Sequence, residues 1–236
     1  MADAAARTLS LVVDVVVAAV DAASTVADVL AGLSSQHVRH VYVVDRPGGA
    51  AARVAMDHGV TAIAEPGRGY GAACRRGAAH AARAVPPPDV LVFMHGGGAD
   101  DPAEVDSLVR PIDRQGMDLV IGSRALGEDD APAGLRARVG REVAIGLIRA
   151  IYGQRYTDLG GFRAVRLPAL VSLGVSDDGP GYNVEMQVKA VKSGLRVAEV
   201  PVHRRRSSPR PAPTLRERAV ASTKILYTIL RHSTAR

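Results

Sequence analysis

Residues 90–94 form a continuously apolar run, Val-Leu-Val-Phe-Met, that passes directly into the glycine loop His95–Gly98. The pair Asp101-Pro102 follows, and it is a helix-start signal. A strand without polar alternation is typical of a sheet that helices cover on both faces. In open α/β sheets, ligands bind at the carboxyl ends of the strands. The segment therefore predicts an α/β fold whose chemistry lies at the loop after this strand.

The rest of the chain alternates in the same way. Apolar or β-branched runs predict strands at 9–17, 41–44, 60–64, 118–122 and 195–202, with a short strand in 157–164. Helical spacing predicts helices at 24–33, 50–58, 72–84, 103–115, 138–152, 168–173, 183–193 and 214–231, the first behind a Ser24-Thr25 cap. Residues 128–134 read as a polar connection. Pro201, which lacks an N–H donor, places the last strand at a sheet edge.

The segment 9–33 is the ambiguous one. Asp14, Asp21 and Asp28 recur every seven residues, which one long helix would also explain. The density of β-branched residues favours a strand followed by a helix. The same carboxylates argue against a membrane span, because each costs about 3 kcal/mol in hydrocarbon.

Size and composition indicate one large domain. At 236 residues the chain suits a single α/β domain, predicted over 1–202, with a basic appendage over 203–236. Aromatic residues make up 3% of the chain, so its core must be aliphatic. The single Cys74 excludes a disulfide framework and a cysteine zinc site, and no secretory signal is visible. We therefore expect a cytoplasmic protein.

The net charge of +6 is concentrated near the carboxyl terminus, where seven arginines lie between residues 204 and 231. A basic segment of this kind suits an anionic surface such as phospholipid headgroups or a lipid phosphate, although a solvated tail is equally compatible. Aromatic residues are not interleaved with the arginines, so no nucleic acid partner is predicted. The closing helix carries Val220, Ile225, Leu226, Ile229 and Leu230, a face for docking on the domain or on the cytoplasmic side of a membrane.

Five blocks in this order resemble the family 2 glycosyltransferases, whose fold is GT-A. The nearest branch looks like the enzymes that transfer a hexose from a nucleotide-sugar to a polyprenyl phosphate, the dolichyl-phosphate mannose synthase type. The blocks are Arg68–Ala72, Asp100–Pro102, Asp118–Arg124, Thr157–Arg163 and Gly181–Ala190. The resemblance implies inverting transfer from a UDP- or GDP-sugar.

The donor-binding motifs depart from the family pattern. The resemblance places Asp21 at the end of the first strand and Asp45, as a contact to the base, at the end of the second. The Asp-x-Asp that holds Mg²⁺ or Mn²⁺ in the family reads His95-Gly96-Gly97 here, so both metal carboxylates are missing and no metal ligand is assigned. His95 can bind a softer metal with Asp100 or Asp101 as a partner, but a lone histidine after a buried strand is more often hydrogen-bonded structure.

Without that cation, arginines would have to neutralise the leaving diphosphate. The candidates are Arg46, Arg68, Arg124 and Arg210, with Gly69 and Gly97 as close backbone contacts to the donor.

The blocks on the acceptor side match the family pattern more closely than the donor-binding motifs do. By resemblance Asp158 lies near the reacting centre and Asp101 contacts the donor or acceptor. A turn or cap role explains Asp158 equally well. Glu185 reads more simply as an i, i+4 partner of Lys189.

Three other classes compete with a working transferase. The His95–Gly98 loop also suits the oxyanion hole of an esterase, but no Gly-x-Ser-x-Gly elbow follows. Gly67, Gly69 and Gly71 lack the spacing of a dinucleotide-binding loop. Loss at all three donor motifs fits a non-catalytic descendant of the transferase fold, a pseudo-glycosyltransferase that binds a partner, and this alternative stays open. The sugar, the nucleotide and the oligomeric state have no sequence signal.

Overall fold

The computed structural model describes residues 10–20, 22–33, 37–67, 69–127, 135–205 and 215–234. Its centre is a seven-stranded sheet in the order β3-β2-β1-β4-β6-β5-β7. The strands are β1 Val13–Ala18, β2 Val38–Asp45, β3 Thr61–Ala64, β4 Val90–His95, β5 Leu119–Ser123, β6 Arg163–Arg166 and β7 Val197–Pro201. Only β6, among the described strands, runs antiparallel to its neighbours. The predicted α/β fold with a mostly parallel sheet is confirmed.

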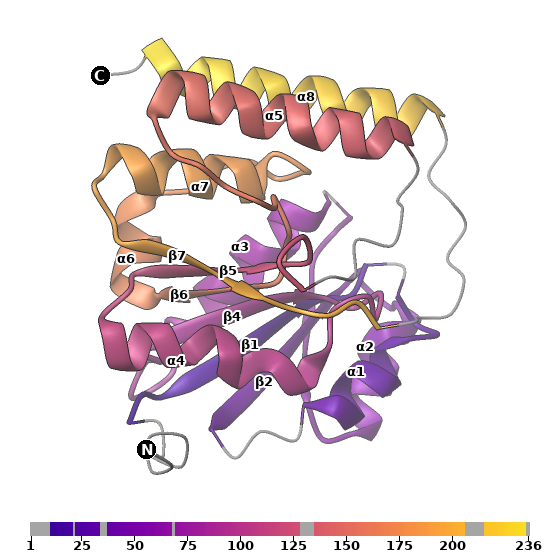
Figure 1. Cartoon of the computed structure of the whole chain (residues 1–236). Helices are drawn as coiled ribbons and strands as arrows, with labels where there is room; N and C mark the ends of the chain where they lie inside the picture. Colours follow the sequence, from indigo (N-terminus) through magenta and orange to yellow (C-terminus); the bar gives the residue numbers. More distant parts are fainter. Residues whose placement is uncertain are drawn as a thin grey trace.

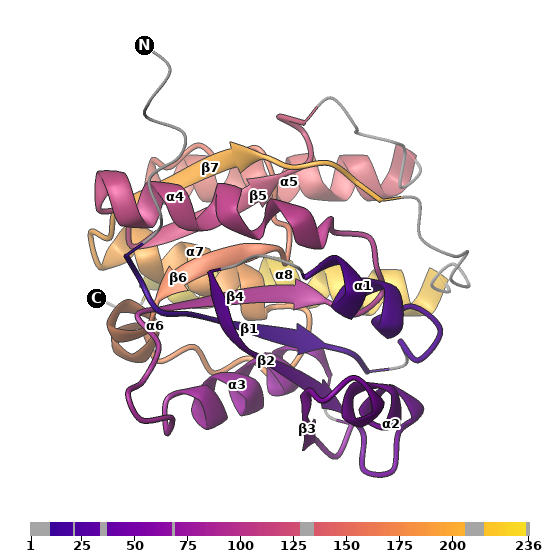
Figure 2. The same cartoon turned by 90° about the horizontal axis from the view of Figure 1, so that it is seen from below.

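Helices cover both faces of the sheet (Figures 1 and 2). They are α1 Val26–Gly32, α2 Ala50–Asp57, α3 Tyr70–Ala81, α4 Val105–Gln115, α5 Leu135–Tyr152, α6 Leu167–Leu173, α7 Tyr182–Lys192 and α8 Leu215–Thr234, with a 3₁₀ turn over Pro102–Glu104. One apolar core lies between the sheet and α1, α2 and α4, and the other between the sheet and α3, α6 and α7. Alternate residues of β1 enter the two cores, Val15 the first and Val16 the second.

Strand β1 shows why the ambiguous segment 9–33 is not one helix. All six of its residues are buried between β2 and β4. Asp14 is tolerated there because Arg39 holds both its oxygens, at 3.0 and 2.8 Å, and the hydroxyl of Tyr42 donates at 3.3 Å. The strand begins at Val13, so the predicted start at residue 9 was too early. Leu11 and Val12, before the strand, are only partly buried, and Leu11 packs at the margin of a core.

Several predicted boundaries need correction. The strand predicted in 157–164 begins at Arg163, because residues 157–162 form the approach to it. The helix predicted from residue 103 is interrupted by the 3₁₀ turn and becomes α-helical at Val105. Thr25 precedes α1 but makes no side-chain cap; its hydroxyl donates to carbonyl oxygens instead. The predicted edge position of residues 195–202 is confirmed by β7, whereas the connection 128–134 lies outside the described residues.

The closing helix α8 packs on α5 and α7, which confirms the prediction that it docks on the domain. Ile229 is fully buried, and the hydroxyl of Tyr152 on α5 donates to its carbonyl at 2.6 Å. Val220 and Leu230 are instead more than half exposed, so the predicted apolar face is divided between the interior and the surface. Among the described helices, none is long and apolar enough to cross a membrane.

Candidate functional site at the carboxyl edge of the sheet

The carboxyl ends of β2, β1, β4 and β5 meet at one edge of the sheet. Ala18 of β1 pairs with Val44 on one side and with His95 on the other. Because β6 is antiparallel, its beginning lies at this edge, and Arg163 stands opposite both Phe93 and Ile121. The segment before β6 therefore enters between the ends of β4 and β5. From β2 to β5 the edge spans four strand spacings, about 19 Å.

The glycine loop is packed tightly on the end of β1. A Cβ on Gly96 would lie 2.8 Å from the Cα of Ala19, which is backbone and cannot move aside. The Gly96 N–H donates to the Ala18 carbonyl at 2.9 Å, and the Thr25 hydroxyl donates to the Gly96 carbonyl at 2.6 Å. Gly98 adopts a φ of 69°, a conformation that favours glycine. Gly96 is thus required by the packing of the loop, and glycine is favoured at Gly98 by its backbone conformation.

His95 is fixed in orientation by two contacts. Its Nδ1 accepts a hydrogen bond from the Gly97 N–H at 3.0 Å, so a neutral ring carries its proton on Nε2. The ring stacks on Tyr70, with centroids 5.6 Å apart and planes within 4° of parallel. The Tyr70 hydroxyl in turn donates to the Gly161 carbonyl at 3.3 Å. Burial raises the pKa of Tyr70 well above its ordinary value, so this phenol remains a donor.

The residues at this loop do not fit the Mg²⁺ or Mn²⁺ that the family resemblance implies. Gly96 and Gly97 offer no side-chain oxygen, and the Nδ1 of His95 already faces an N–H. Asp100 directs Oδ2 at the His95 N–H, 3.4 Å away, and Asp101 accepts from the Ala103 N–H at 3.2 Å as an N-cap. Nowhere in the described part of the chain do three His, Cys, Asp or Glu side chains gather as a metal would need. Hard cations require oxygen ligands, which this loop lacks.

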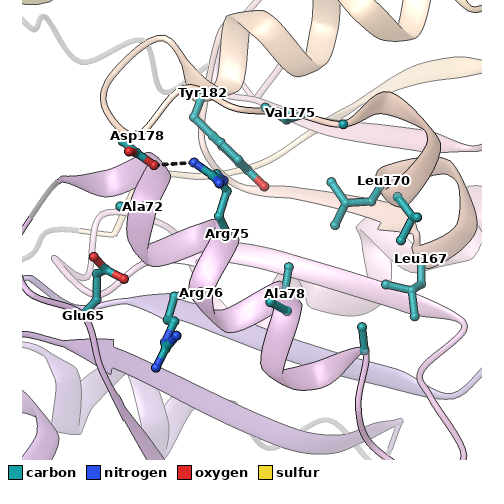
Figure 3. A pocket seen from close by; sticks show the side chains of 14 residues that line it. Glu65, Ala72, Arg75, Arg76, Ala78, Leu167, Leu170, Val175, Asp178 and Tyr182 are labelled. Carbon is teal, nitrogen blue, oxygen red and sulfur yellow. Dashed lines mark hydrogen bonds and ion pairs between the residues drawn. The ribbon is translucent and has the colours of Figure 1, made fainter.

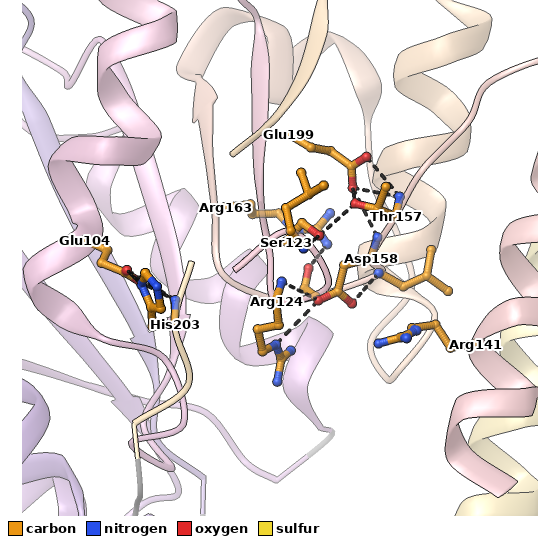
Figure 4. Close-up of polar contacts among 12 residues, drawn as sticks. Glu104, Ser123, Arg124, Arg141, Thr157, Asp158, Arg163, Glu199 and His203 are labelled. Atoms are coloured by element: carbon orange, nitrogen blue, oxygen red, sulfur yellow. Dashed lines mark hydrogen bonds and ion pairs between the residues drawn. The ribbon is translucent and has the colours of Figure 1, made fainter. Parts of the chain in front are cut away.

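Asp158 lies at the end of β5, where Figure 4 shows it beside Arg124. It is 6% exposed. One carboxylate oxygen, Oδ2, accepts from the Arg124 N–H at 3.2 Å and lies 3.5 Å from the Nε of the Arg124 side chain. The other, Oδ1, accepts from the Leu159 N–H at 2.7 Å. A Cβ on Gly160 would approach Arg124 and Asp158 to within 3.4 Å, so a side chain there would crowd the pair.

Glu199 anchors this segment, and sequence reasoning missed it. Its carboxylate, on β7, accepts from the Thr157 N–H at 2.9 and 3.0 Å, from the Thr157 hydroxyl at 3.0 Å and from the Asp158 N–H at 3.1 Å (Figure 4). The Thr157 hydroxyl also meets that of the buried Ser123 at 2.7 Å. The available sequence signal was a single carboxylate within the otherwise uncharged Val197–Pro201 strand.

Arg163 is a second missed residue, although it ends one of the quoted blocks. Its side chain is completely buried, and burial lowers its pKa. The guanidinium donates to the carbonyls of Gly160 and Asn183, the latter at 3.0 Å, while its Nε has no partner within the described structure. It therefore ties the Gly160 turn to α7 and leaves a fixed positive charge beneath that turn.

The remaining predicted residues are distributed as follows. Asp45 is buried and accepts from the Arg46 N–H at 2.7 Å and from the Ala52 N–H at 3.0 Å, which holds the start of α2. Gly69 has a φ of 117°, and a Cβ on it would meet the Asp178 carbonyl at 2.8 Å. Asp21, Arg68 and Arg210 lie outside the described residues.

Glu185 is structural. It forms the predicted pair with Lys189 at 2.7 Å and also accepts from the N–H groups of Ser176 and Asp177. Burial acts to raise the pKa of Glu185, but these donors together lower it. The carboxylate fixes the loop before α7 to that helix.

The molecule also has a pocket of about 390 Å³ between α3 and α6, shown in Figure 3. Alanines of α3 and the side chains of Leu167 and Leu170 line it, and the ion pair of Arg75 with Asp178 at 2.5 Å crosses its rim. Its lining does not include Asp45, His95 or Asp158. The edge of the sheet, where the predicted residues gather, is therefore a separate region.

Comparison with known proteins identifies the fold. No family model matches the chain. Over 95% of its length it superposes on 79% of glucosyl-3-phosphoglycerate synthase from Mycobacterium tuberculosis, with a TM-score of 0.75 and 22% identity. It also superposes on mannosyl-3-phosphoglycerate synthase from Rubrobacter xylanophilus, covering 95% of this chain and 74% of that one with a TM-score of 0.71 and 17% identity. The chain has the GT-A fold.

The chain is similar in sequence to curated glycosyltransferases. It is 34% identical over 155 residues to an uncharacterised glycosyltransferase of Mycobacterium tuberculosis, a match that covers 64% of this chain and 66% of that protein. It is 28% identical over 181 residues to glycosyltransferase AglJ of Haloferax volcanii, covering 76% of this chain and 58% of that protein. The chain thus spans just under two thirds of the length of the first relative.

Proposed function

We propose that the carboxyl edge of the sheet binds a nucleotide-diphospho-sugar and that the chain transfers its hexose to an acceptor. In this arrangement the base lies toward Asp45, and the sugar lies near the stacked Tyr70 and His95. The acceptor approaches Asp158. The observation that carries the proposal is the buried pairing of Asp158 with Arg124 at the same edge as His95, produced by the antiparallel β6.

Cationic side chains supply the countercharge for the diphosphate in this proposal. Arg124 is 27% exposed on its side chain and borders the edge beside Asp158. Arg46 follows Asp45, and the resemblance adds Arg68 and Arg210. Fixed positive charges can stabilise a leaving diphosphate without a cation. Donor binding should therefore be indifferent to Mn²⁺, as the loop His95–Gly97 has no oxygen ligands for it.

The acceptor is proposed to carry a phosphate. The resemblance points to a polyprenyl phosphate, whereas the superposed glucosyl-3-phosphoglycerate synthase binds phosphoglyceric acid together with UDP and Mn²⁺. A phosphate oxygen is already ionised and needs little help from a base. A sugar or glycerate hydroxyl must lose a proton, which the Asp158 carboxylate is placed to accept.

One observation favours a second candidate, a non-catalytic binding protein. The residues that hold metal in the resembled family are replaced by His95, Gly96 and Gly97, while the acceptor-side blocks keep more of the family pattern. A chain that had ceased turnover but still bound a nucleotide-sugar, or only a partner, would keep this scaffold.

Calorimetric titration of UDP-, GDP- and TDP-sugars, with and without Mn²⁺, tests the donor site. We expect binding of one nucleotide class that Mn²⁺ does not change, and Asp45→Ala should weaken it by at least about tenfold, or 1.4 kcal/mol. The matched control is Asp57→Ala, an exposed carboxylate at the end of the same α2. Unchanged affinity in Asp45→Ala would refute the assigned base site, and no binding of any sugar nucleotide would leave the partner-binding candidate.

Turnover with the bound donor separates the acceptor classes. Asp158→Asn should abolish transfer to a hydroxyl acceptor such as phosphoglycerate but only reduce transfer to a polyprenyl phosphate. Donor binding without transfer to either acceptor would establish the non-catalytic candidate.

A further inference from the structure

The outer surface of α5 and α8 carries most of the exposed apolar side chains of the molecule. Ten large hydrophobic residues are exposed within the described part of the chain, and six of them belong to these two helices. They are between 37% and 59% exposed: Val139, Val143 and Ile151 on α5, and Val220, Tyr227 and Leu230 on α8. Elsewhere such residues occur singly, which is normal for a protein surface.

These six side chains form one face, here called the outer face. On α5 they recur at intervals of four and eight residues, and on α8 at seven and three, so each set lies along one side of its helix. Figure 1 shows the two helices side by side as the outermost layer, beyond α7. Ile148 and Ile229 belong to the core; Val139 and Val143 lie on the side of α5 away from Ile148, whereas Ile151, three residues after Ile148, lies at the margin of the outer face. The outer face is therefore left exposed after the inner sides of the two helices have packed on the domain.

The same two helices hold a charge equal to the net charge of the chain. Their sequences, Leu135–Tyr152 and Leu215–Thr234, contain eight Lys and Arg residues and two Glu residues, a balance of +6. The whole chain also has a net charge of +6. Arg149 and Arg231 are exposed beside the apolar positions, whereas Arg141 pairs with Glu142 at 3.4 Å and Lys224 pairs with Asp177 at 3.3 Å. The layer is thus apolar and cationic together.

From this combination we infer that the outer face docks on an anionic bilayer surface. Apolar side chains enter the boundary between headgroups and acyl chains, while the exposed Arg149 and Arg231 are attracted to anionic headgroups. Tyr227 suits this boundary because its ring is apolar and its hydroxyl polar. A second copy of the chain is a poorer occupant, because a symmetric contact would bring two layers of charge +6 together.

The helices also relate this surface to the edge of the sheet. In Figure 1 both begin on the side of the molecule toward which β1 and β4 point. A bilayer under the outer face would accordingly lie beside the region of His95 and Asp158, within reach of an acceptor held in that bilayer. The docking inference depends on the two helices alone and stands whether or not the edge binds a nucleotide-sugar.

Vesicle co-sedimentation without nucleotide-sugar tests the inference on the whole chain. We expect binding to vesicles of phosphatidylcholine with phosphatidylglycerol, weak binding to phosphatidylcholine alone, and loss of binding at high salt. The triple variant Val143→Ser, Tyr227→Ser, Leu230→Ser should lower partitioning at least about tenfold. Arg149→Gln should weaken it and reduce its salt dependence.

Matched controls lie on other surfaces. Met56→Ser with Val171→Ser removes equally exposed apolar groups from α2 and α6, and Arg53→Gln removes an exposed charge from α2. Neither should change partitioning. Absence of binding to anionic vesicles, or equal loss in the triple variant and the controls, would overturn the inference. A dimer in sedimentation equilibrium that the triple variant dissociates would assign the outer face to a second copy and also overturn it.

Discussion

The carboxylate of Glu199 should control both the stability of the chain and the placement of Asp158. It receives four hydrogen-bond contacts at 2.9 to 3.1 Å from the backbone and hydroxyl of Thr157 and from the Asp158 N–H. Strand β7 thereby holds a segment 42 residues away in sequence. Glu199→Ala removes all of these acceptors at once and leaves two backbone N–H groups without their partner.

The expected magnitude follows from the groups left behind. A hydrogen bond to a charged acceptor contributes about 1.5–3 kcal/mol, and an unsatisfied buried donor costs about 1–3 kcal/mol. Because Thr157 and Glu199 are only partly buried, water recovers part of this loss. We expect Glu199→Ala to lower the free energy of unfolding by about 3 kcal/mol and Glu199→Gln by about half as much, because a neutral acceptor bonds more weakly.

The effect on transfer, if the chain turns over, should be separable from donor binding. Asp158 would keep its contacts with Leu159 and Arg124 but lose its backbone anchor. A displacement of about 1 Å in a reacting group can reduce a rate about 100-fold. Donor affinity should change little, because Glu199 contacts none of the residues assigned to the base or the glycine loop.

Chemical denaturation measures the first effect, and calorimetry with single-turnover transfer measures the second. Glu142→Gln is the matched control, an exposed carboxylate on α5. The reasoning is refuted if Glu199→Ala unfolds at the same denaturant concentration as this control. A donor affinity that falls in parallel with stability would instead mean that Glu199 supports the whole edge and not Asp158 in particular.

Three further predictions concern single sites. Gly96→Ala should lower the free energy of unfolding by about 2 kcal/mol, because the added methyl group overpacks against Ala19. Gly146→Ala on α5, where the space around the Cβ position is open, should raise it by about 0.5–1 kcal/mol in the same denaturation assay, and equal effects of the two substitutions would contradict the packing argument. Burial lowers the pKa of His232 from 6.5, so the unfolded chain binds its proton first and stability should fall as pH drops from about 6.5 toward the folded value. His232→Gln should flatten that part of the stability–pH curve, and an unchanged slope would contradict the assignment of this pH dependence to His232. Asp14→Ala should cost about 3 kcal/mol by leaving Arg39 unpaired, and a loss no larger than that of an exposed Asp→Ala would show that the buried pair does not stabilise the fold.

Local sequence patterns were sufficient to predict much of the architecture. The apolar run at 90–94 is β4, and it lies in the middle of the sheet with every residue of the run buried. Pro201 correctly predicted an edge strand, because a missing N–H donor is a property of one residue. The pair of Glu185 with Lys189 followed from i, i+4 spacing on one helix. Each of these predictions depends only on neighbours in sequence.

The candidate site depended on contacts that no local pattern encodes. The antiparallel direction of β6 places the segment before it, with Asp158, at the carboxyl edge of the sheet, and the composition of a strand does not reveal which way it runs. Thr25 bonds Gly96 across 71 residues instead of capping its own helix, because the packed loop offers its hydroxyl a buried carbonyl. Sequence alone therefore determined which segments are strands and helices and where the glycine loop follows a strand. Only the tertiary structure decided that Tyr70 stacks on His95 and that Glu199 holds Asp158, since burial in a common environment, and not spacing along the chain, brings those side chains together.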